Sequence, residues 1–165
     1  MLVIFLDIDG VLKVARHGRD EYGNLFYIPY MENLRNIIEQ TNAKIVISST
    51  WRNRGLEALQ KMWAHRGIAG EIIDVTINSH YISEEGRTNK YNQFRRGREI
   101  QDWIDEHGTE ITNYVIIDDD NDMLPSQRGN FVRTANNINH PDCIDIGFGL
   151  TKICSENAIR ILNRP

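Results

Sequence analysis

The chain has 165 residues, a length that suits one domain with a sizeable hydrophobic core. Apolar residues make up 41% of it and charged residues 25%, which excludes an intrinsically disordered chain. The formal net charge of −4 argues against a protein that coats DNA without specificity, although it allows a local basic groove.

Five short apolar runs predict the strands of a parallel sheet. The first, Leu2–Leu6, is continuous and rich in β-formers, which is typical of a strand buried on both faces. The others, in chain order, are Lys44–Ile47, 71–75, 114–117 and the shorter, weaker run 131–132.

Apolar side chains at helical spacing predict four helices that alternate with these strands or follow them. Thr151 is the expected N-cap of the last helix. The apolar faces are formed by Leu34, Ile37 and Ile38; by Leu56, Leu59 and Trp63; by Ile100, Trp103 and Ile104; and by Cys154, Ala158, Ile161 and Leu162.

The alternation of strands and helices predicts an α/β fold, a doubly wound, Rossmann-like three-layer α/β/α domain with a central parallel sheet. We expect residues 1–165 to form a single domain. The stretches 13–30 and 76–95 look irregular and exceed the usual length of a connection, so they are functional flaps or solvated loops. Each is too short for a separate cap, so no large cap domain is expected.

Polar clusters follow three of the predicted strands, where ligands of parallel α/β sheets bind. A lone pair or run of acids is usually a turn or a solvated loop, but three clusters that converge on one edge are more specific. Acids packed together there require a cation, and oxygen ligands suit Mg²⁺ in phosphoryl transfer. The clusters contain Asp7, Asp9 and Gly10; Ser48, Ser49 and Arg52; and Asp118, Asp119, Asp120 and Asp122.

These motifs resemble those of haloacid dehalogenase (HAD) superfamily phosphatases, over nearly the whole chain. DIDGVL is similar to the first motif of that superfamily, and SST and IIDDDND are similar to the second and fourth. The resemblance is closest to the HAD domain of Swiss Army Knife RNA repair proteins. It is carried by SSTWR, by RGREIQDWIDEH before YVIIDDD, and by FVRT with a later GLT.

The resemblance implies a role for each matching residue of the first two motifs. Asp7 matches the nucleophile that forms an aspartyl-phosphate, and Asp9 matches the general acid/base that protonates the leaving group and then activates water. Ser48 matches the phosphate ligand of the second motif, and Ser49 is the alternative one position later.

The resemblance also implies a Mg²⁺ site. Asp118 and Asp119 match the acidic pair that holds the metal, together with the side chain of Asp7 and the backbone carbonyl of Asp9. Asp122 is the alternative to one member of the pair, at a DxxxD spacing from Asp118.

The third motif requires a basic residue near the start of the helix before the fourth main strand. Arg96 matches best, and Arg95, Arg98 and Lys90 are its rivals. Basic residues at a helix start oppose the helix dipole, so an ordinary solvated face does not explain this cluster. Arg52 is expected either to bind a second phosphate or the substrate, or to form a surface salt bridge.

The substrate is less sharply indicated. Segment 87–98 contains five basic residues with Tyr91 and Phe94 among them, a pattern that suits a phosphate-backbone groove and also a solvated loop. Six of the 23 acids belong to the clusters at the strand ends, so the rest of the chain has more bases than acids. The resemblance to repair proteins implies RNA or DNA ends, or nucleotides, as phosphorylated substrates.

The leading hypothesis is therefore a Mg²⁺-dependent phosphomonoesterase that acts through an aspartyl-phosphate on nucleic-acid terminal phosphates or nucleotides. The alternative is a non-catalytic HAD-like module that binds phosphorylated ends or a partner protein, although binding alone does not need Asp9 as an acid/base. A signalling receiver domain is disfavoured because Thr76, Ile77 and Asn78 follow run 71–75 and provide no phosphoacceptor.

Other features argue against further sites. Residues 1–6 are too few for a signal peptide or a membrane span, so we expect a cytoplasmic protein without a membrane partner. Trp51 and Trp103 are expected to pack rather than to stack on bases. Neither cysteine, Cys143 or Cys154, indicates a zinc site or a disulfide. The histidines show no metal-ligand spacing and are expected to be non-catalytic, and His17 is the strongest exception because it lies in the first flap. They are His17, His65, His80, His107 and His140.

Overall fold

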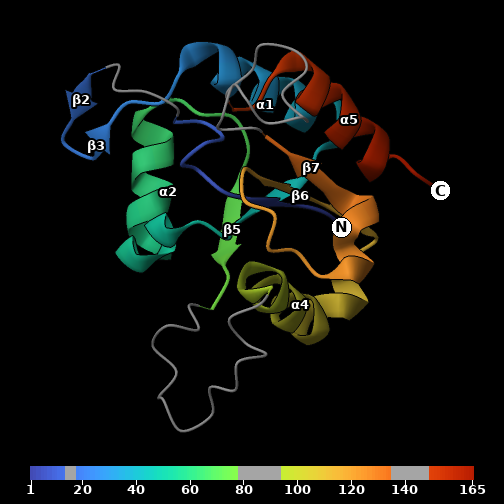
Figure 1. Cartoon of the computed structure of the whole chain (residues 1–165). Coiled ribbons are helices and arrows are strands. Elements are labelled where there is room, and N and C mark those ends of the chain that lie inside the picture. Colours follow the sequence, from blue (N-terminus) through green and yellow to red (C-terminus); the bar gives the residue numbers. More distant parts are fainter. Residues whose placement is uncertain (14–17, 78–93, 135–148) are drawn as a thin grey trace, which may run out of the picture.

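The computed structural model describes residues 1–13, 18–77, 94–134 and 149–165, and its centre is a five-stranded sheet (Figure 1). The strand order is β5–β4–β1–β6–β7, and every pair is parallel. The sheet confirms all five predicted strands, with ends that shift by at most a residue. Their bounds are β1 (Leu2–Leu6), β4 (Lys44–Ile47), β5 (Ile72–Val75), β6 (Asn113–Asp118) and β7 (Phe131–Arg133).

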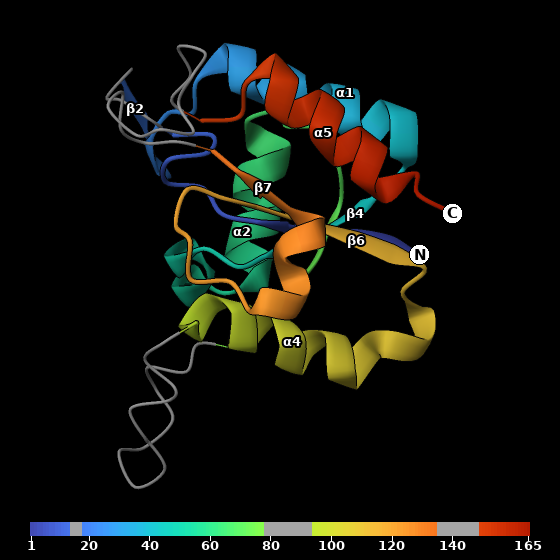
Figure 2. The same ribbon diagram turned by 45° about the vertical axis from the view of Figure 1, so that its right-hand side comes forward.

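Helices cover both faces of the sheet, as predicted for three layers. In Figure 2, α1 and α5 lie side by side on one face and α4 lies on the other. The predicted N-cap of α5 is confirmed, since the Thr151 hydroxyl accepts a hydrogen bond of 3.3 Å from the Cys154 backbone N–H. The bounds are α1 (Ile28–Thr41), α2 (Leu56–His65), α4 (Arg95–His107) and α5 (Lys152–Leu162).

The alternation of side chains along β1 divides the core in two. Ile4 and Leu6 join the larger cluster, which packs against α1, α2 and α5. Val3 and Phe5 join the smaller one, which contains Trp103 of α4. Because both faces of β1 are buried, this strand lies at the centre of the sheet, where its carboxyl end can bear a site.

The register aligns the ends of the three central strands. Leu6 pairs with Ile47 of β4 and with Ile117 of β6. The residues that follow these three, Asp7, Ser48 and Asp118, therefore meet at the same edge of the sheet. We call this the carboxyl edge.

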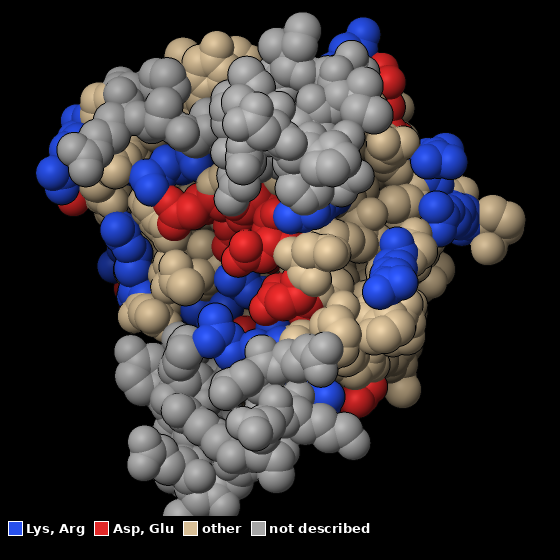
Figure 3. All heavy atoms as spheres, in the orientation of Figure 1, with Lys and Arg blue, Asp and Glu red and all other residues tan. Residues whose placement is uncertain are grey.

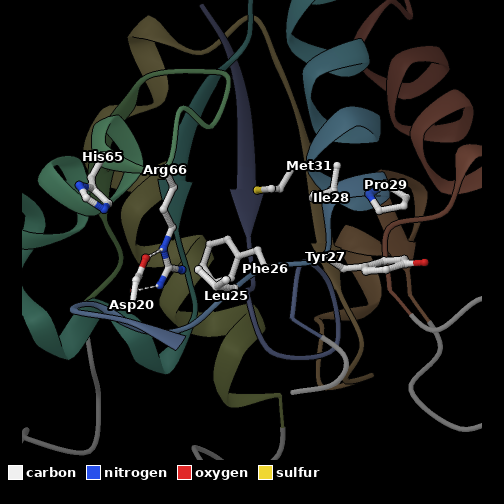
Figure 4. Close-up of a pocket in the computed structure, with 9 residues that line it drawn as sticks. All are labelled: Asp20, Leu25, Phe26, Tyr27, Ile28, Pro29, Met31, His65 and Arg66. Atoms are coloured by element: carbon white, nitrogen blue, oxygen red, sulfur yellow. Dashed lines mark hydrogen bonds and ion pairs between the residues drawn. The ribbon is translucent and has the colours of Figure 1, made fainter. Parts of the chain in front are cut away.

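The stretch 13–30 is not wholly irregular, which corrects the prediction. It contains a two-stranded antiparallel hairpin, β2 (Arg19–Asp20) and β3 (Gly23–Asn24), before α1 begins. Arg66, which follows α2, donates to the Asp20 carboxylate at 2.9 and 2.7 Å, and its guanidinium lies 4.5 Å over the ring of Phe26 (Figure 4). These contacts hold the hairpin against α2.

Short 3-10 helices complete the connections; they are η1 (Thr50–Arg54), η4 (Gly108–Glu110) and η5 (Pro125–Asn130). Within the described ranges, no helix combines the length and apolarity needed to cross a membrane. Trp103 is buried and packs edge-on against Phe5 with ring centroids 5.4 Å apart, which confirms its predicted packing role.

Candidate active site

Three carboxylates meet at the carboxyl edge. Asp7 directly follows β1, Asp118 is the last residue of β6, and Asp119 comes next. One oxygen of each lies within 4.8 Å of the others, and Asp7 and Asp118 are buried. We call these three residues the acidic triad. Figure 3 shows acidic side chains gathered in the middle of one face of the molecule, with basic side chains beside them.

The turn after β1 depends on Gly10. Its φ of +78° lies in the left-handed region, and an added Cβ would lie 2.3 Å from Cγ of Asp119. The carbonyl of Gly10 also accepts a hydrogen bond of 2.9 Å from the Thr134 hydroxyl. Glycine therefore lets the loop after β1 approach the loop after β6 closely enough to assemble the triad.

Arg96, at the start of α4, reaches the carboxylates of Asp7 and Asp118. Its Nη1 atom donates to Oδ1 of Asp7 at 3.1 Å and lies 3.5 Å from Oδ2 of Asp118. It also donates to the carbonyl of Ser48. Its rivals Arg95 and Arg98 are half-buried on the same helix. The structure thus brings the preferred candidate of the third motif to the predicted nucleophile.

Burial controls the protonation of this cluster. It raises the pKa of Asp7 and raises that of Asp118 well above its ordinary value, and the positive charge of Arg96 opposes both shifts only in part. Burial also acts to lower the pKa of Arg96, but Asp118 and Asp7 outweigh it and hold that pKa above the ordinary value.

The buried charges do not balance. Within the described ranges, they comprise three acids and two bases: Asp7, Glu99, Asp118, Arg52 and Arg96. Asp119, half-buried in the triad, adds a further negative charge. A buried excess of negative charge is costly unless a cation compensates it, so the triad suits a divalent cation with oxygen ligands.

Arg52 is buried beneath the site rather than exposed beside it. Its Nη2 atom lies 2.7 Å from Oε2 of Glu99, and Nη1 donates to the carbonyls of Ser48 and Ser49. The sequence allowed Arg52 to form a salt bridge at the surface. Arg52 does form a salt bridge, but the pair is buried. Burial lowers the pKa of Arg52, and Glu99 opposes this shift.

Glu99 was missed by the sequence analysis. It lies one helical turn after Arg96, and both face the sheet from α4. In the sequence, the sign of Glu99 was an acid three positions after Arg96, the preferred candidate for the third motif. It could not reveal the partner, because Arg52 is 47 positions away in the sequence.

Asp9 lies outside the triad and is half-exposed. Lys13 donates to its Oδ1 atom, and the indole Nε1 of Trp51 donates to Oδ2 at 2.8 Å. Trp51 also packs edge-on against Phe26, as predicted, with ring centroids 5.4 Å apart. Neither donor to Asp9 was anticipated. Together they fix the direction in which its carboxylate points.

The two serines after β4 have different positions. The Ser49 side chain forms a hydrogen bond with the Asp7 carboxyl, which acts to lower the pKa of Asp7. The Ser49 hydroxyl also accepts from the backbone N–H of Trp51 at 3.4 Å, which caps η1. Ser48 is fully buried, and its hydroxyl has no hydrogen-bond partner among the described residues.

Asp122 caps α4. Its Oδ2 atom accepts the backbone N–H of Arg96 at 3.1 Å, and its carbonyl accepts that of Gly97 at 3.2 Å. Phe94, the N-cap residue, offers no side-chain cap. The negative charge of Asp122, with the triad behind it, compensates the basic start of this helix. Asp122 therefore has a structural position distinct from the triad.

The family described as the HAD domain in Swiss Army Knife RNA repair proteins matches residues 3–138. The chain belongs to this family. The match includes the triad and Arg96, and HAD domains are typical of phosphohydrolases. No curated protein and no solved structure matches the chain.

The remaining histidines and cysteine that the structure describes lie outside the triad of this HAD domain. They include His65 and His107. Cys154 is a half-buried free cysteine. The predictions that fall outside the described residues are those on Lys90, on Tyr91 and most of the segment 87–98, on Cys143, and on His17, His80 and His140.

Proposed function

We propose that this HAD domain is a Mg²⁺-dependent phosphomonoesterase that forms an aspartyl-phosphate on Asp7, with nucleic-acid terminal phosphates or nucleotides as substrates. The observation that carries the proposal is the position of Asp7. It is buried at the carboxyl edge, where Arg96 contacts both Asp7 and Asp118, in a cluster with excess negative charge.

The triad is suited to hold the metal. Asp7, Asp118 and Asp119 would bind Mg²⁺ through carboxylate oxygens, with the backbone carbonyl of Asp9 as a further ligand. Oδ2 of Asp118 is buried and accepts no hydrogen bond among the described residues, which leaves it available as a ligand. When bound, the ion lowers the repulsion between these carboxylates and an incoming phosphate and stabilises charge on the transferring group.

Asp7 and Asp9 divide the chemistry between them. A carboxylate oxygen of Asp7 attacks phosphorus, the bond from phosphorus to the leaving oxygen breaks, and Asp9 gives that oxygen a proton. Water then attacks the phosphorus of the aspartyl-phosphate and gives a proton to Asp9. The bond from phosphorus to Asp7 breaks, which releases inorganic phosphate and restores both carboxyl groups.

The neighbouring residues support this chemistry. The positive charge of Arg96 offsets charge on the phosphorylated Asp7. The unpartnered hydroxyl of Ser48 would donate to a phosphate oxygen, while Ser49 orients Asp7 through its hydrogen bond. Arg52 supports both serines through their carbonyls.

Turnover of an aryl phosphate by the purified chain tests the proposal. We expect hydrolysis with Mg²⁺, none after chelation, and loss of at least a hundredfold in Asp7→Asn. Asp105→Asn is the matched control, because Asp105 is an exposed acid on α4 that accepts a hydrogen bond from Gln101. Mass spectrometry of acid-quenched protein should find the phosphoryl group on Asp7.

A panel of mononucleotides, of oligonucleotides with 3′- or 5′-terminal phosphates, and of small metabolites identifies the substrate.

Full activity in Asp7→Asn would overturn the assigned nucleophile. Mg²⁺-dependent binding of phosphorylated ends without turnover on the whole panel would instead support the non-catalytic alternative.

A further inference from the structure

A polar pocket of about 430 Å³ opens beside Asp9, outside the acidic triad. Lys13 and Trp51 line it, and these are the two residues that donate to the Asp9 carboxylate. If Asp9 protonates the leaving oxygen, as the proposed function requires, the group attached to that oxygen lies next to this pocket. The inference below therefore rests on the proposed function.

The lining of the pocket is strongly basic. Lys13, Arg19 and Arg54 contribute three positive charges, and no acidic residue is among its described lining residues. Arg19, on β2, is exposed and forms no ion pair or hydrogen bond through its side chain within the described ranges. A positive pocket with a free guanidinium suits an anionic group, and phosphate is an anion that guanidinium binds with matching, bidentate geometry.

One face of the aromatic ring in the pocket is already occupied by a side chain of the protein. The guanidinium of Arg54 lies 4.1 Å from the centroid of the Trp51 ring and covers it, while Phe26 packs against the ring edge-on. The accessible groups are therefore charged and polar, including the amide of Asn24. Groups of this kind suit the phosphate backbone of a nucleic acid rather than its bases.

The pocket is held in place before any ligand binds. Arg54 donates to the carbonyl of Tyr22 at 2.6 Å, and Arg66 holds Asp20 with two hydrogen bonds. The β2–β3 hairpin, which carries Arg19 and Asn24, is thus fixed from η1 and from α2. A pocket that needs no ordering on binding keeps more of its interaction energy as affinity.

We infer that this pocket binds the phosphodiester that follows the terminal phosphate of a nucleic-acid strand. The terminal phosphate occupies the triad, the leaving oxygen lies at Asp9, and the next phosphate of the strand lies against Arg19 and Arg54. The domain therefore selects strand ends over mononucleotides and small phosphorylated metabolites, without preference for the base.

The decisive experiment compares three substrates with the same terminal phosphate. They are a nucleoside monophosphate, the corresponding dinucleotide, and that dinucleotide with an uncharged methylphosphonate linkage. We expect kcat/KM for the dinucleotide to exceed that for the other two by about tenfold, mainly through KM. The neutral linkage keeps the size and the bases, so only the second charge distinguishes it from the dinucleotide.

Arg19 variants connect this preference to the pocket. Arg19→Glu should reduce the ratio of kcat/KM between the charged and the neutral dinucleotide to about one, and Arg19→Lys should retain most of it. The salt dependence of KM should weaken by the contribution of about one phosphate contact in Arg19→Glu. Arg160→Glu is the matched control, because Arg160 is an exposed arginine on α5 outside the pocket.

The outcomes separate this inference from the proposed function. Equal hydrolysis of all three substrates, with no effect of Arg19→Glu, overturns the pocket and leaves the phosphatase intact. If no substrate is hydrolysed, the result contradicts the proposed phosphatase function. Fluorescence anisotropy with a labelled, terminally phosphorylated oligonucleotide then decides for the pocket: weaker binding by Arg19→Glu than by Arg160→Glu supports it, and equal binding overturns it.

Discussion

Nη1 of Arg96 lies 3.1 Å from Oδ1 of Asp7, although 89 positions separate the two residues in the sequence. This contact joins the start of α4 to the end of β1 and places a positive charge against Asp7 and Asp118. Because the same guanidinium would offset charge on Asp7 in the proposed reaction, we expect this contact to affect both the stability of the fold and the activity.

Replacement of Arg96 by methionine should test that link. The variant keeps the length of the side chain and leaves Asp7 and Asp118 buried together without their cation. We expect a loss of about 3–5 kcal/mol in the free energy of unfolding, measured with urea in the absence of metal. Saturating Mg²⁺ should restore part of it. An unchanged stability would show that the acids are not ionised in the folded metal-free protein.

Substitutions in the Arg52–Glu99 pair should show whether Arg52 only stabilises the fold or also binds the substrate. Arg52→Met leaves Glu99 as an uncompensated buried charge, so we expect a loss of about 3–5 kcal/mol by urea denaturation. The double variant Arg52→Met, Glu99→Met should recover most of this loss. If the double variant recovers stability without activity, Arg52 also acts on the phosphate; if both return together, its role is structural.

The indole of Trp51 should position Asp9. Trp51→Phe keeps a ring against Phe26 and removes the N–H that donates to Asp9. We expect kcat to fall roughly tenfold, since a hydrogen bond to a charged group contributes about 1.5 kcal/mol, with a shifted pH profile and little change in Tm. Trp103→Phe is the control, because its indole donates to Asp74 at 2.6 Å, away from the triad. A Trp51→Phe enzyme with wild-type kcat and pH profile contradicts the positioning role.

Much of the fold follows from local patterns, and the site follows in part. The apolar runs predict the strands, and because parallel strands end at one edge, they also bring Asp7 and Asp118 together. The pairing of Arg52 with Glu99 and the capping of α4 by Asp122 depend on tertiary packing, which has no local signal. The strands of the β2–β3 hairpin are two residues long, too short for any alternation to show.

Asp118 should make the metal-free protein less stable as pH rises. Burial raises its pKa in the folded state, so its favourable contribution is complete below the ordinary value of 3.8 and is lost as pH rises through the folded pKa. We therefore expect Asp118→Asn to exceed the wild type in Tm at neutral pH with chelator.

Added Mg²⁺ should reverse this order. It should raise the Tm of the wild type by an amount that grows with pH, and it should have little effect on Asp118→Asn. Asp105→Asn is the control and should behave as the wild type does. A wild-type Tm that does not respond to Mg²⁺ at any pH contradicts the metal site.

The Asp20–Arg66 pair should have the opposite dependence on pH. The hydrogen bonds from Arg66 lower the pKa of Asp20 from 3.8 to about 2. Its contribution to stability is therefore present above pH 3.8 and is lost as pH falls towards 2. Asp20→Asn should remove this acid-dependent loss, measured by urea denaturation at a series of pH values, while Glu21→Gln should keep it. Identical acid profiles for wild type and Asp20→Asn would show that the hairpin does not depend on this pair.

The close approach of Gly10 to Asp119 has an evolutionary consequence. No larger residue fits at position 10 while an aspartate occupies position 119, because the added carbon and the carboxylate would need the same space. The two positions are therefore expected to change together among relatives. A lineage that replaced Asp119 by a smaller residue would remove this steric conflict, and the left-handed φ at position 10 would then limit the replacements to residues that tolerate it, such as asparagine.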